Sequence, residues 1–124
     1  MNRLRLIVTL LGAFFALQGL GFLLVPQRAV ESLGMPLLDG IGRSTQLGDF
    51  AAFFLVGGIA ILYGSRPGNA RALLFPAALI GGAAVTRTLA WLLQGASFAG
   101  MFIAVEVITG LILYRAANTI DSRL

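Results

Sequence analysis

Three ionisable side chains, Asp49, Arg87 and Glu106, each stand inside a different long apolar run of the sequence. Charged groups inside lipid-spanning helices are costly, so they generally face the interior of a bundle, where they pair or line a path for an ion or a substrate. Two carboxylates and a guanidinium within reach of one another offer ion pairing, proton transfer or the binding of a cation or an amine. These residues are therefore the first candidates for a functional site.

Two further polar residues extend this set. Gln18 lies in the first apolar run, and Arg43 stands just before the second. With a helical rise of about 1.5 Å per residue, the four polar side chains within the runs fall about 6 to 12 Å below the outer ends of their helices. We expect one polar layer in the outer half of a bundle. The candidate ligand or proton site consists of Gln18, Arg43, Asp49, Arg87 and Glu106.

This polar layer has a structural and a functional interpretation. The short segment 94–97 makes the third and fourth runs neighbours, so Arg87 and Glu106 are the expected ion pair. Polar contacts inside membranes average only about 0.6 kcal/mol, so such a lock would give specificity more than stability. In the functional interpretation, one arginine faces two carboxylates, which leaves a formal charge of −1 unless Arg43 reaches in. The surplus carboxylate would then hold a proton, a cation or a ligand amine.

Composition excludes several kinds of chemistry. The chain has no cysteine and no histidine, which removes disulfides, thiol redox chemistry, histidine-ligated haem and the usual histidine general base. Asp49 and Glu106 could act as acid and base with Arg87 holding an oxyanion, but nothing in their spacing is diagnostic. Five acidic residues spread across the chain give only weak support to a carboxylate-bound metal. No phosphate loop, nucleophile elbow or metal motif is present. We expect no catalytic residue, no metal and no cofactor.

The elements that would position these residues are membrane-spanning helices. Of the 124 residues, 58% are hydrophobic and 11% are charged, against about 25% charged in soluble domains. Apolar runs at 4–25, 45–64, 71–93 and 98–115 are each near the length of about 20 residues that crosses a bilayer. The sequence predicts an all-α protein, one transmembrane domain formed by a four-helix bundle. A short interfacial helix from Pro26 to Gly34 is expected between the first two spans.

The first run also has the charged start of a signal peptide. It is longer than the roughly 7–15 apolar residues of such a peptide, and no small-residue cleavage site follows it. We expect it to be retained as the first helix.

Arginines predict the orientation of the helices. The chain has nine arginines and no lysine, with abundant alanine and glycine, which is typical of a bacterium with a GC-rich genome. Six arginines fall on the side of both termini, against two on the other side: Arg3, Arg5, Arg66, Arg71, Arg115 and Arg123, against Arg28 and Arg43. The positive-inside rule then places both termini in the cytoplasm, in a bacterial inner membrane. The arginines form no basic stripe, so no nucleic-acid partner is expected.

Small and aromatic residues are expected mainly to pack the helices. The small residues are Gly12, Ala16, Gly57, Gly58, Gly81, Gly82, Ala83, Ala84, Thr109 and Gly110. They would allow backbones to approach closely. The phenylalanines Phe14, Phe15, Phe50, Phe53 and Phe54 are likewise expected to pack or to contact lipid rather than to form a binding site.

The layout resembles that of DoxX-like proteins and related bacterial four-helix membrane families. The resemblance rests on the first helix ending at Pro26, the turn Leu33-Gly34-Met35-Pro36, the charged entry into the second helix and the lone Arg87 in the third. It covers nearly the whole chain and implies the fold and the membrane location. Some DoxX-like proteins are associated with membrane redox assemblies. Because this chain lacks cysteine and histidine, such a role would be that of a cofactor-free membrane partner.

The leading functional hypothesis is a small non-enzymatic membrane module, accessory or self-associating, with a polar pocket in its outer half. The first alternative is a proton-coupled carrier or channel for a small or lipophilic solute. The second is a lipid-modifying enzyme. Expected partners are membrane lipids and either further copies of the chain or a larger membrane protein.

Overall fold

The protein is a helical membrane protein whose spans form two packed pairs. The computed structural model describes residues 2–121, in which the elements are α1 (Arg3–Leu24), α2 (Pro26–Ser32), α3 (Gly40–Gly64), the 3-10 helix η1 (Ala70–Leu73), α4 (Leu74–Gln94) and α5 (Gly100–Thr119). Four of these helices, α1, α3, η1 with α4, and α5, are long and apolar enough to cross a membrane. The prediction of an all-α, four-helix, multi-pass protein is confirmed.

Three of the long helices differ from the predicted spans by more than one residue at an end. Helix α3 begins at Gly40 rather than at residue 45, because its polar first residues continue the helix beyond the apolar run on which the prediction was based. Helix α4 proper begins at Leu74, after the 3-10 turn η1, rather than at residue 71. Helix α5 runs from Gly100 to Thr119 rather than from 98 to 115, since Ala116 and Ala117 are buried in the core and keep the last turn packed.

Helices α1 and α3 form the tighter pair, and glycines explain their closeness. A Cβ on Gly58 would lie 2.8 Å from the carbonyl oxygen of Gly12, and a Cβ on Gly19 would lie 2.6 Å from the backbone nitrogen of Leu55. Only glycine leaves room for backbones this close, so these residues fix the crossing of the two helices. The predicted close approach is present here. Gly82, in contrast, is exposed with nothing within 4 Å of an added Cβ.

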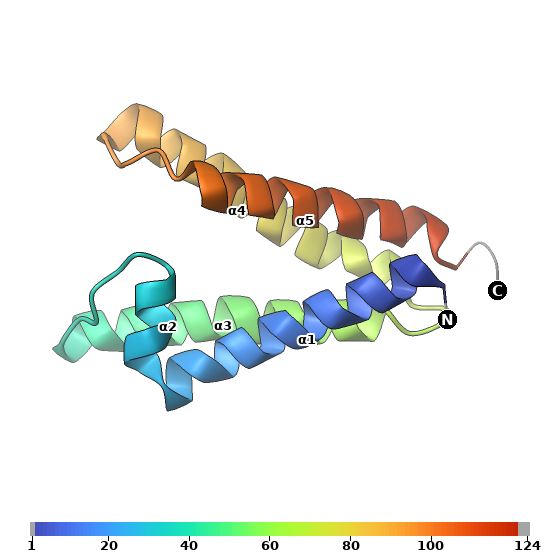
Figure 1. Cartoon of the computed structure of the whole chain (residues 1–124), viewed down its shortest axis with the longest axis horizontal. Coiled ribbons are helices and arrows are strands. Elements are labelled where there is room, and N and C mark those ends of the chain that lie inside the picture. Colours follow the sequence, from blue (N-terminus) through green and yellow to red (C-terminus); the bar gives the residue numbers. More distant parts are fainter. Residues whose placement is uncertain (1, 122–124) are drawn as a thin grey trace.

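Helices α4 and α5 form the second pair, as the short connection between them predicts. Figure 1 shows the two pairs lying close together at the end where α1 begins and α5 ends, and diverging toward the other end. A core that includes Val8, Ile61, Leu73, Leu113 and Ile120 fills the narrow end. The molecule is therefore a wedge, and its open end is the one that contains the predicted polar layer.

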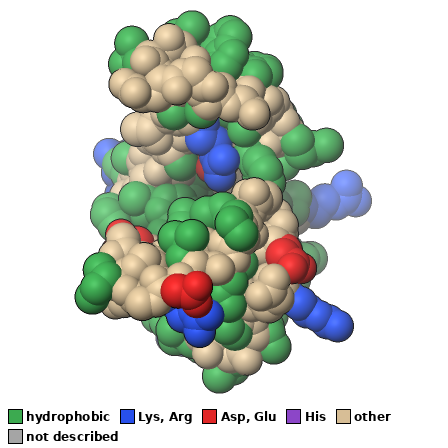
Figure 2. All heavy atoms as spheres, turned by 90° about the vertical axis from the view of Figure 1, so that its left-hand side faces the viewer, with side chains coloured by type: hydrophobic (Ala, Val, Ile, Leu, Met, Phe, Trp, Pro, Cys, Tyr) green, Lys and Arg blue, Asp and Glu red, His purple; other side chains and the backbone are tan. Residues whose placement is uncertain are grey.

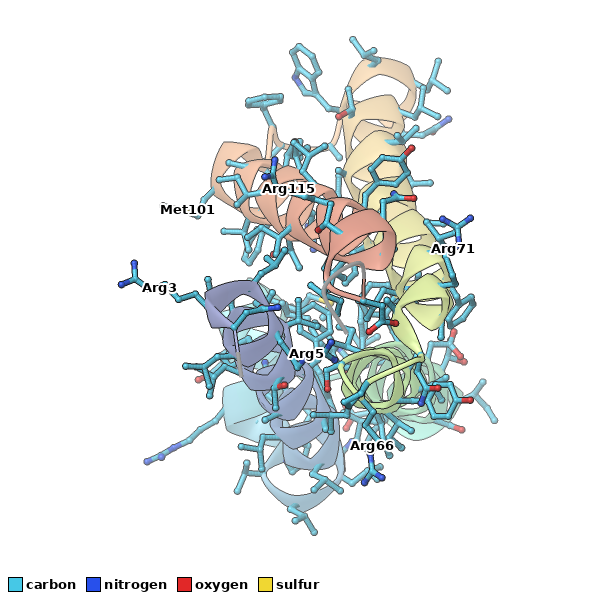
Figure 3. The ribbon with its side chains drawn as sticks, turned by 90° about the vertical axis from the view of Figure 1, so that its right-hand side faces the viewer. Arg3, Arg5, Arg66, Arg71, Met101 and Arg115 are labelled. Carbon is cyan, nitrogen blue, oxygen red and sulfur yellow. The ribbon has the colours of Figure 1, made fainter. Side chains whose placement is uncertain are left out.

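A buried arginine ties the narrow end together. Arg5 is 6% exposed and donates to the backbone carbonyls of Ser65, at the end of α3, and of Ile120, just after α5, and it pairs with Asp121 at 3.0 Å. Figure 3 looks onto this end and labels Arg5 with Arg3, Arg66, Arg71 and Arg115. These five arginines were predicted for one side of the membrane; Arg123, the sixth, lies outside the described residues. We call Arg5, Ser65, Ile120 and Asp121 the arginine node.

Asp121 completes the arginine node and predicts a pH dependence. The backbone N–H groups of Ala70 and Gly68 donate to its carboxylate at 2.9 and 3.2 Å. The Ala70 bond, then Arg5, then Gly68 hold the pKa of Asp121 below its ordinary value. A lowered pKa in the folded state means stabilisation that is present above the unfolded pKa and is lost as the pH falls. We expect thermal stability in detergent to decline as the pH drops below about 4. Asp121→Asn should flatten that decline, and an unchanged pH profile would contradict the assignment.

The short helix α2 packs against α1 and α3 at the open end of the wedge. Ala29 and Val30 of α2 are buried with Phe22 of α1 and Ala51 of α3. The buried side chain of Gln46 secures the following turn, because it accepts from the N–H of Leu38 at 3.0 Å and donates to the carbonyl of Pro36 at 2.9 Å. The predicted short helix is present, and this packing directs its last residue, Ser32, toward the space between the pairs.

Candidate functional site

A cavity of about 280 Å³ lies between the two helix pairs, and we call it the interhelical cavity. Figure 2 faces the open end of the wedge and shows a basic side chain, with an acidic one behind it, in the hollow between the halves. Every helix except η1 contributes to its lining, which consists of Phe14, Phe15, Gln18, Ser32, Leu33, Phe53, Phe54, Ile80, Arg87, Met101, Phe102, Val105 and Glu106. Its walls are thus largely aromatic and aliphatic, with a few polar groups.

The predicted ion pair between α4 and α5 forms one wall of this cavity. Nε of Arg87 donates to Oε2 of Glu106 at 3.1 Å and lies 3.0 Å from Oε1. The two side chains are 31% and 15% exposed. The guanidinium carbon of Arg87 also lies 4.7 Å from the centroid of the Phe102 ring, a cation–π contact. The Phe102 ring, on the same α4–α5 hairpin, thus helps to hold the Arg87–Glu106 ion pair in position.

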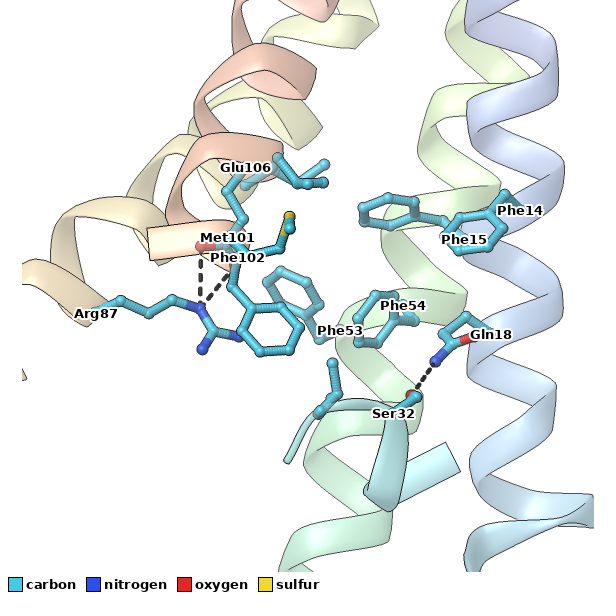
Figure 4. A pocket seen from close by; sticks show the side chains of 13 residues that line it. Phe14, Phe15, Gln18, Ser32, Phe53, Phe54, Arg87, Met101, Phe102 and Glu106 are labelled. Atoms are coloured by element: carbon cyan, nitrogen blue, oxygen red, sulfur yellow. Dashed lines mark hydrogen bonds and ion pairs between the residues drawn. The ribbon is translucent and has the colours of Figure 1, made fainter. Parts of the chain in front are cut away.

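Gln18 and Ser32 stand on the opposite wall. The side-chain amide of Gln18 donates to the hydroxyl of Ser32 at 3.1 Å, and that hydroxyl donates to the carbonyl of Ala29 at 2.6 Å. Figure 4 shows this bond across the cavity from Arg87 and Glu106. Gln18 therefore shares the cavity with the ion pair, as its depth predicts, without contacting either charged residue.

Asp49 borders a second space on the other side of the same ion pair. This side cavity, of about 390 Å³, is lined by Asp49 with Phe50, Ala83 and Thr86, and it shares Leu33, Phe53, Phe54, Arg87 and Glu106 with the interhelical cavity. The Asp49 side chain is exposed and makes no ion pair or side-chain hydrogen bond within residues 2–121. Asp49 is thus near the pair, but the structure does not draw it into the pair.

Arg43 does not join the candidate site, which corrects the sequence-based prediction. Its guanidinium pairs with Asp39 at 3.2 Å and donates to the carbonyl of Leu38 at 2.7 Å. It lines neither the interhelical cavity nor the side cavity. The reason is the earlier start of α3, which makes Arg43 and Asp39 neighbours one helical turn apart, close to the start of the helix.

The phenylalanines combine the packing role that was predicted with a role as cavity wall. Phe15 contacts Phe54 at 5.2 Å between ring centroids, and Phe54 contacts Phe53 at 5.1 Å. The same rings, with Phe14, face the interhelical cavity. Phe102 and Ser32 also line the interhelical cavity, although neither was among the predicted site residues. Phe102 stands four residues before Glu106, so the two side chains lie on one face of α5. This spacing in the sequence is the signal that places Phe102 beside the ion pair.

The ion pair predicts a coupled effect of mutation. Arg87→Ala leaves the Glu106 carboxylate without its charged partner, and we expect the free energy of unfolding in detergent to fall by about 1–3 kcal/mol. Adding Glu106→Gln should recover much of that loss. The measurement is a double-mutant cycle from thermal or denaturant unfolding. Arg28→Ala, at an exposed arginine of α2, is the control and should change stability by less than about 0.5 kcal/mol. Additive losses would show that the pair is not coupled.

None of the protein-family models, curated proteins or solved structures compared with this chain matches it.

Proposed function

We propose that this protein is a small non-enzymatic module of the bacterial inner membrane that holds an apolar or amphipathic molecule between its two helix pairs. It would work as an accessory subunit or as a self-associating protein, with membrane lipids and further copies or a larger membrane protein as partners. We include in this proposal a relation to DoxX-like proteins, which is supported by the four spans and the turn at residues 33–36.

The observation that carries the proposal is the interhelical cavity itself. Helices of a membrane bundle normally pack without a gap of this size, since van der Waals contact between them is a main source of their association. Here the pairs diverge around about 280 Å³ lined by aromatic rings and one ion pair. An apolar pocket with a few convergent polar groups is the usual form of a small-molecule site.

The polar residues of the cavity favour binding over catalysis. Glu106 is engaged by Arg87, and so is not a free general base. The Ser32 hydroxyl accepts from Gln18 and donates to Ala29, so it has no adjacent base to activate it as a nucleophile. These contacts argue against the hypothesis of a lipid-modifying enzyme.

Occupation of the cavity can be tested with a blocking substitution. Val105 lines the cavity on α5, whereas Ile108, on the same helix, is 59% exposed and lines none of the cavities described here. Small molecules that co-purify with the protein in mild detergent would be extracted and identified by mass spectrometry. We expect the wild type and Ile108→Trp to carry the same bound amphiphile and Val105→Trp to lose it. Equal amounts in all three proteins would overturn the proposal.

The arginine distribution supports the orientation that we propose, with both termini in the cytoplasm. The described part of the narrow end holds Arg3, Arg5, Arg66, Arg71 and Arg115, whereas α2 and the start of α3 hold only Arg28 and Arg43. Reporter fusions after Ser97 and at Leu124 should report opposite sides of the membrane, with the C-terminal fusion cytoplasmic. The same side at both positions would contradict the fourth span, and an outside C-terminal fusion would reverse the orientation.

The wedge shape also favours a second candidate, a carrier. The pairs are joined at the arginine node and open at the other end, which is the geometry of a structure closed to one side of a membrane. A carrier requires a second state in which the node opens. Proteoliposomes that take up a bound amphiphile, with uptake lost in Val105→Trp, would favour the carrier; binding without uptake favours the binding module.

A further inference from the structure

The ion pair leaves hydrogen-bonding capacity unused at the polar end of the interhelical cavity. Arg87 bonds Glu106 through Nε, and within residues 2–121 its two terminal nitrogens donate no hydrogen bond. Oε1 of Glu106 is fully buried and accepts no hydrogen bond, although it lies 3.0 Å from the same Nε. A buried acceptor without a donor costs free energy, and native proteins generally satisfy such groups. The site thus holds free donors beside a free acceptor, and a ligand group reaches Oε1 when the Glu106 side chain rotates toward the cavity that it lines.

A complementary ligand group would carry an acceptor for the guanidinium and a donor for the carboxylate on the same or adjacent atoms. A hydroxyl group and a primary amide both do so. An ester or an ether offers only the acceptor, and a hydrocarbon offers neither. Oε1 of Glu106 would remain unsatisfied beside either of those groups.

The charge of the site selects a neutral ligand. Arg87 and Glu106 carry opposite charges and cancel, so a charged head group would bring an unpaired charge into a low-dielectric space. Asp49 does not enter this sum, because its exposed side chain lines the side cavity and not the interhelical cavity. The site therefore favours a neutral head group over the charged fatty-acid, phosphate and amine head groups that surround a membrane protein.

The size of the cavity limits the apolar part of the ligand. An engineered cavity of about 150 Å³ holds one benzene molecule, so about 280 Å³ accommodates one slender chain or ring system rather than two acyl chains. Phe14 and Met101, at the rim, are 60% and 77% exposed. A chain longer than the cavity can therefore continue past this rim into the bilayer.

We infer that the interhelical cavity binds a neutral amphiphile with a single apolar chain and a hydroxyl or primary-amide head, which is held between Arg87 and Glu106. This inference rests on the proposed binding function and narrows its ligand class. Two sources fit this chemistry, a monoacylglycerol and a fatty amide.

The test compares C18 probes that differ in their head groups. Monoolein, oleamide, methyl oleate, oleate and oleylamine are titrated onto the purified protein in detergent, and binding is read by native mass spectrometry. We expect monoolein or oleamide to bind at least about tenfold more tightly than the other three, a factor equivalent to about 1.4 kcal/mol. The tighter of the two identifies the source. Val105→Trp should abolish this binding, and Ile108→Trp should preserve it.

Charge variants give a second, independent test. Glu106→Gln leaves a net positive site and should shift the preference to oleate. Arg87→Gln leaves a net negative site and should shift it to oleylamine. If the wild type binds oleate or oleylamine most tightly and Val105→Trp removes that binding, the neutral-ligand inference is wrong and the binding function stands. If no probe is lost in Val105→Trp, the binding function fails as well. The order of probe affinities is measured on the wild-type protein. It can therefore refute the inference even if a charge variant does not fold.

Discussion

Gly58→Val is expected to separate α1 from α3 and to destabilise the protein by about 3 kcal/mol, the upper part of the range for overpacking substitutions. A Cβ at this position would lie 2.8 Å from the Cα atom of Ala16 and 2.8 Å from the carbonyl oxygen of Gly12, and closer still to the backbone nitrogen of Ala16. Backbone atoms of a helix cannot rotate away as a side chain can. The helices must therefore move apart, which also breaks the Phe15–Phe54 contact in the cavity wall.

The matched control is the same substitution at Gly82 in α4, where nothing lies within 4 Å of an added Cβ. Valine is no worse than glycine in a helix interior, so Gly82→Val should change stability by less than about 1 kcal/mol. Both variants are compared by circular dichroism during thermal unfolding in the same detergent. Equal stability of the two would mean that α1 and α3 do not cross at Gly58.

Arg5→Ala should lower the free energy of unfolding by about 2–4 kcal/mol, because a hydrogen bond to a charged group contributes about 1.5–3 kcal/mol and the buried guanidinium makes two to backbone carbonyls. The ion pair with Asp121 adds little, since that carboxylate is partly exposed to solvent. The two carbonyls that lose their donor are those of Ser65 and Ile120. These two bonds tie α1 to the ends of α3 and α5, so the loss should be felt across the narrow end of the wedge.

Two further variants separate the hydrogen bonds from the charge. Arg3→Ala removes an exposed arginine on the first turn of the same helix and should have an effect below about 0.5 kcal/mol. Arg5→Lys keeps the charge but lacks the planar set of donors that reaches two carbonyls and a carboxylate, so its stability should fall between those of the wild type and Arg5→Ala. If Arg5→Ala is as stable as Arg3→Ala, the arginine node does not hold the helices together.

The sequence by itself determined the number of spans and the position of each polar residue along its span. Long apolar runs must be helical in a bilayer, because a backbone without water has to satisfy its own hydrogen bonds. The pairing of Arg87 with Glu106 was also predictable, since a connection as short as residues 94–97 forces α4 and α5 together and the depths of the two residues agree. Local composition and chain connectivity are sufficient for such features.

The tertiary structure alone decided which residues share the candidate site and which arginine is buried. Arg3 and Arg5 look equivalent in the sequence, yet only Arg5 faces the ends of α3 and α5. Arg43 belonged to the predicted site, but the longer α3 pairs it with Asp39. The cavity was not predictable either, because apolar residues cover every face of these helices and composition does not reveal which face meets another helix and which meets lipid. That choice depends on the close fit of glycines such as Gly58 against a particular neighbour, which is a property of two surfaces together.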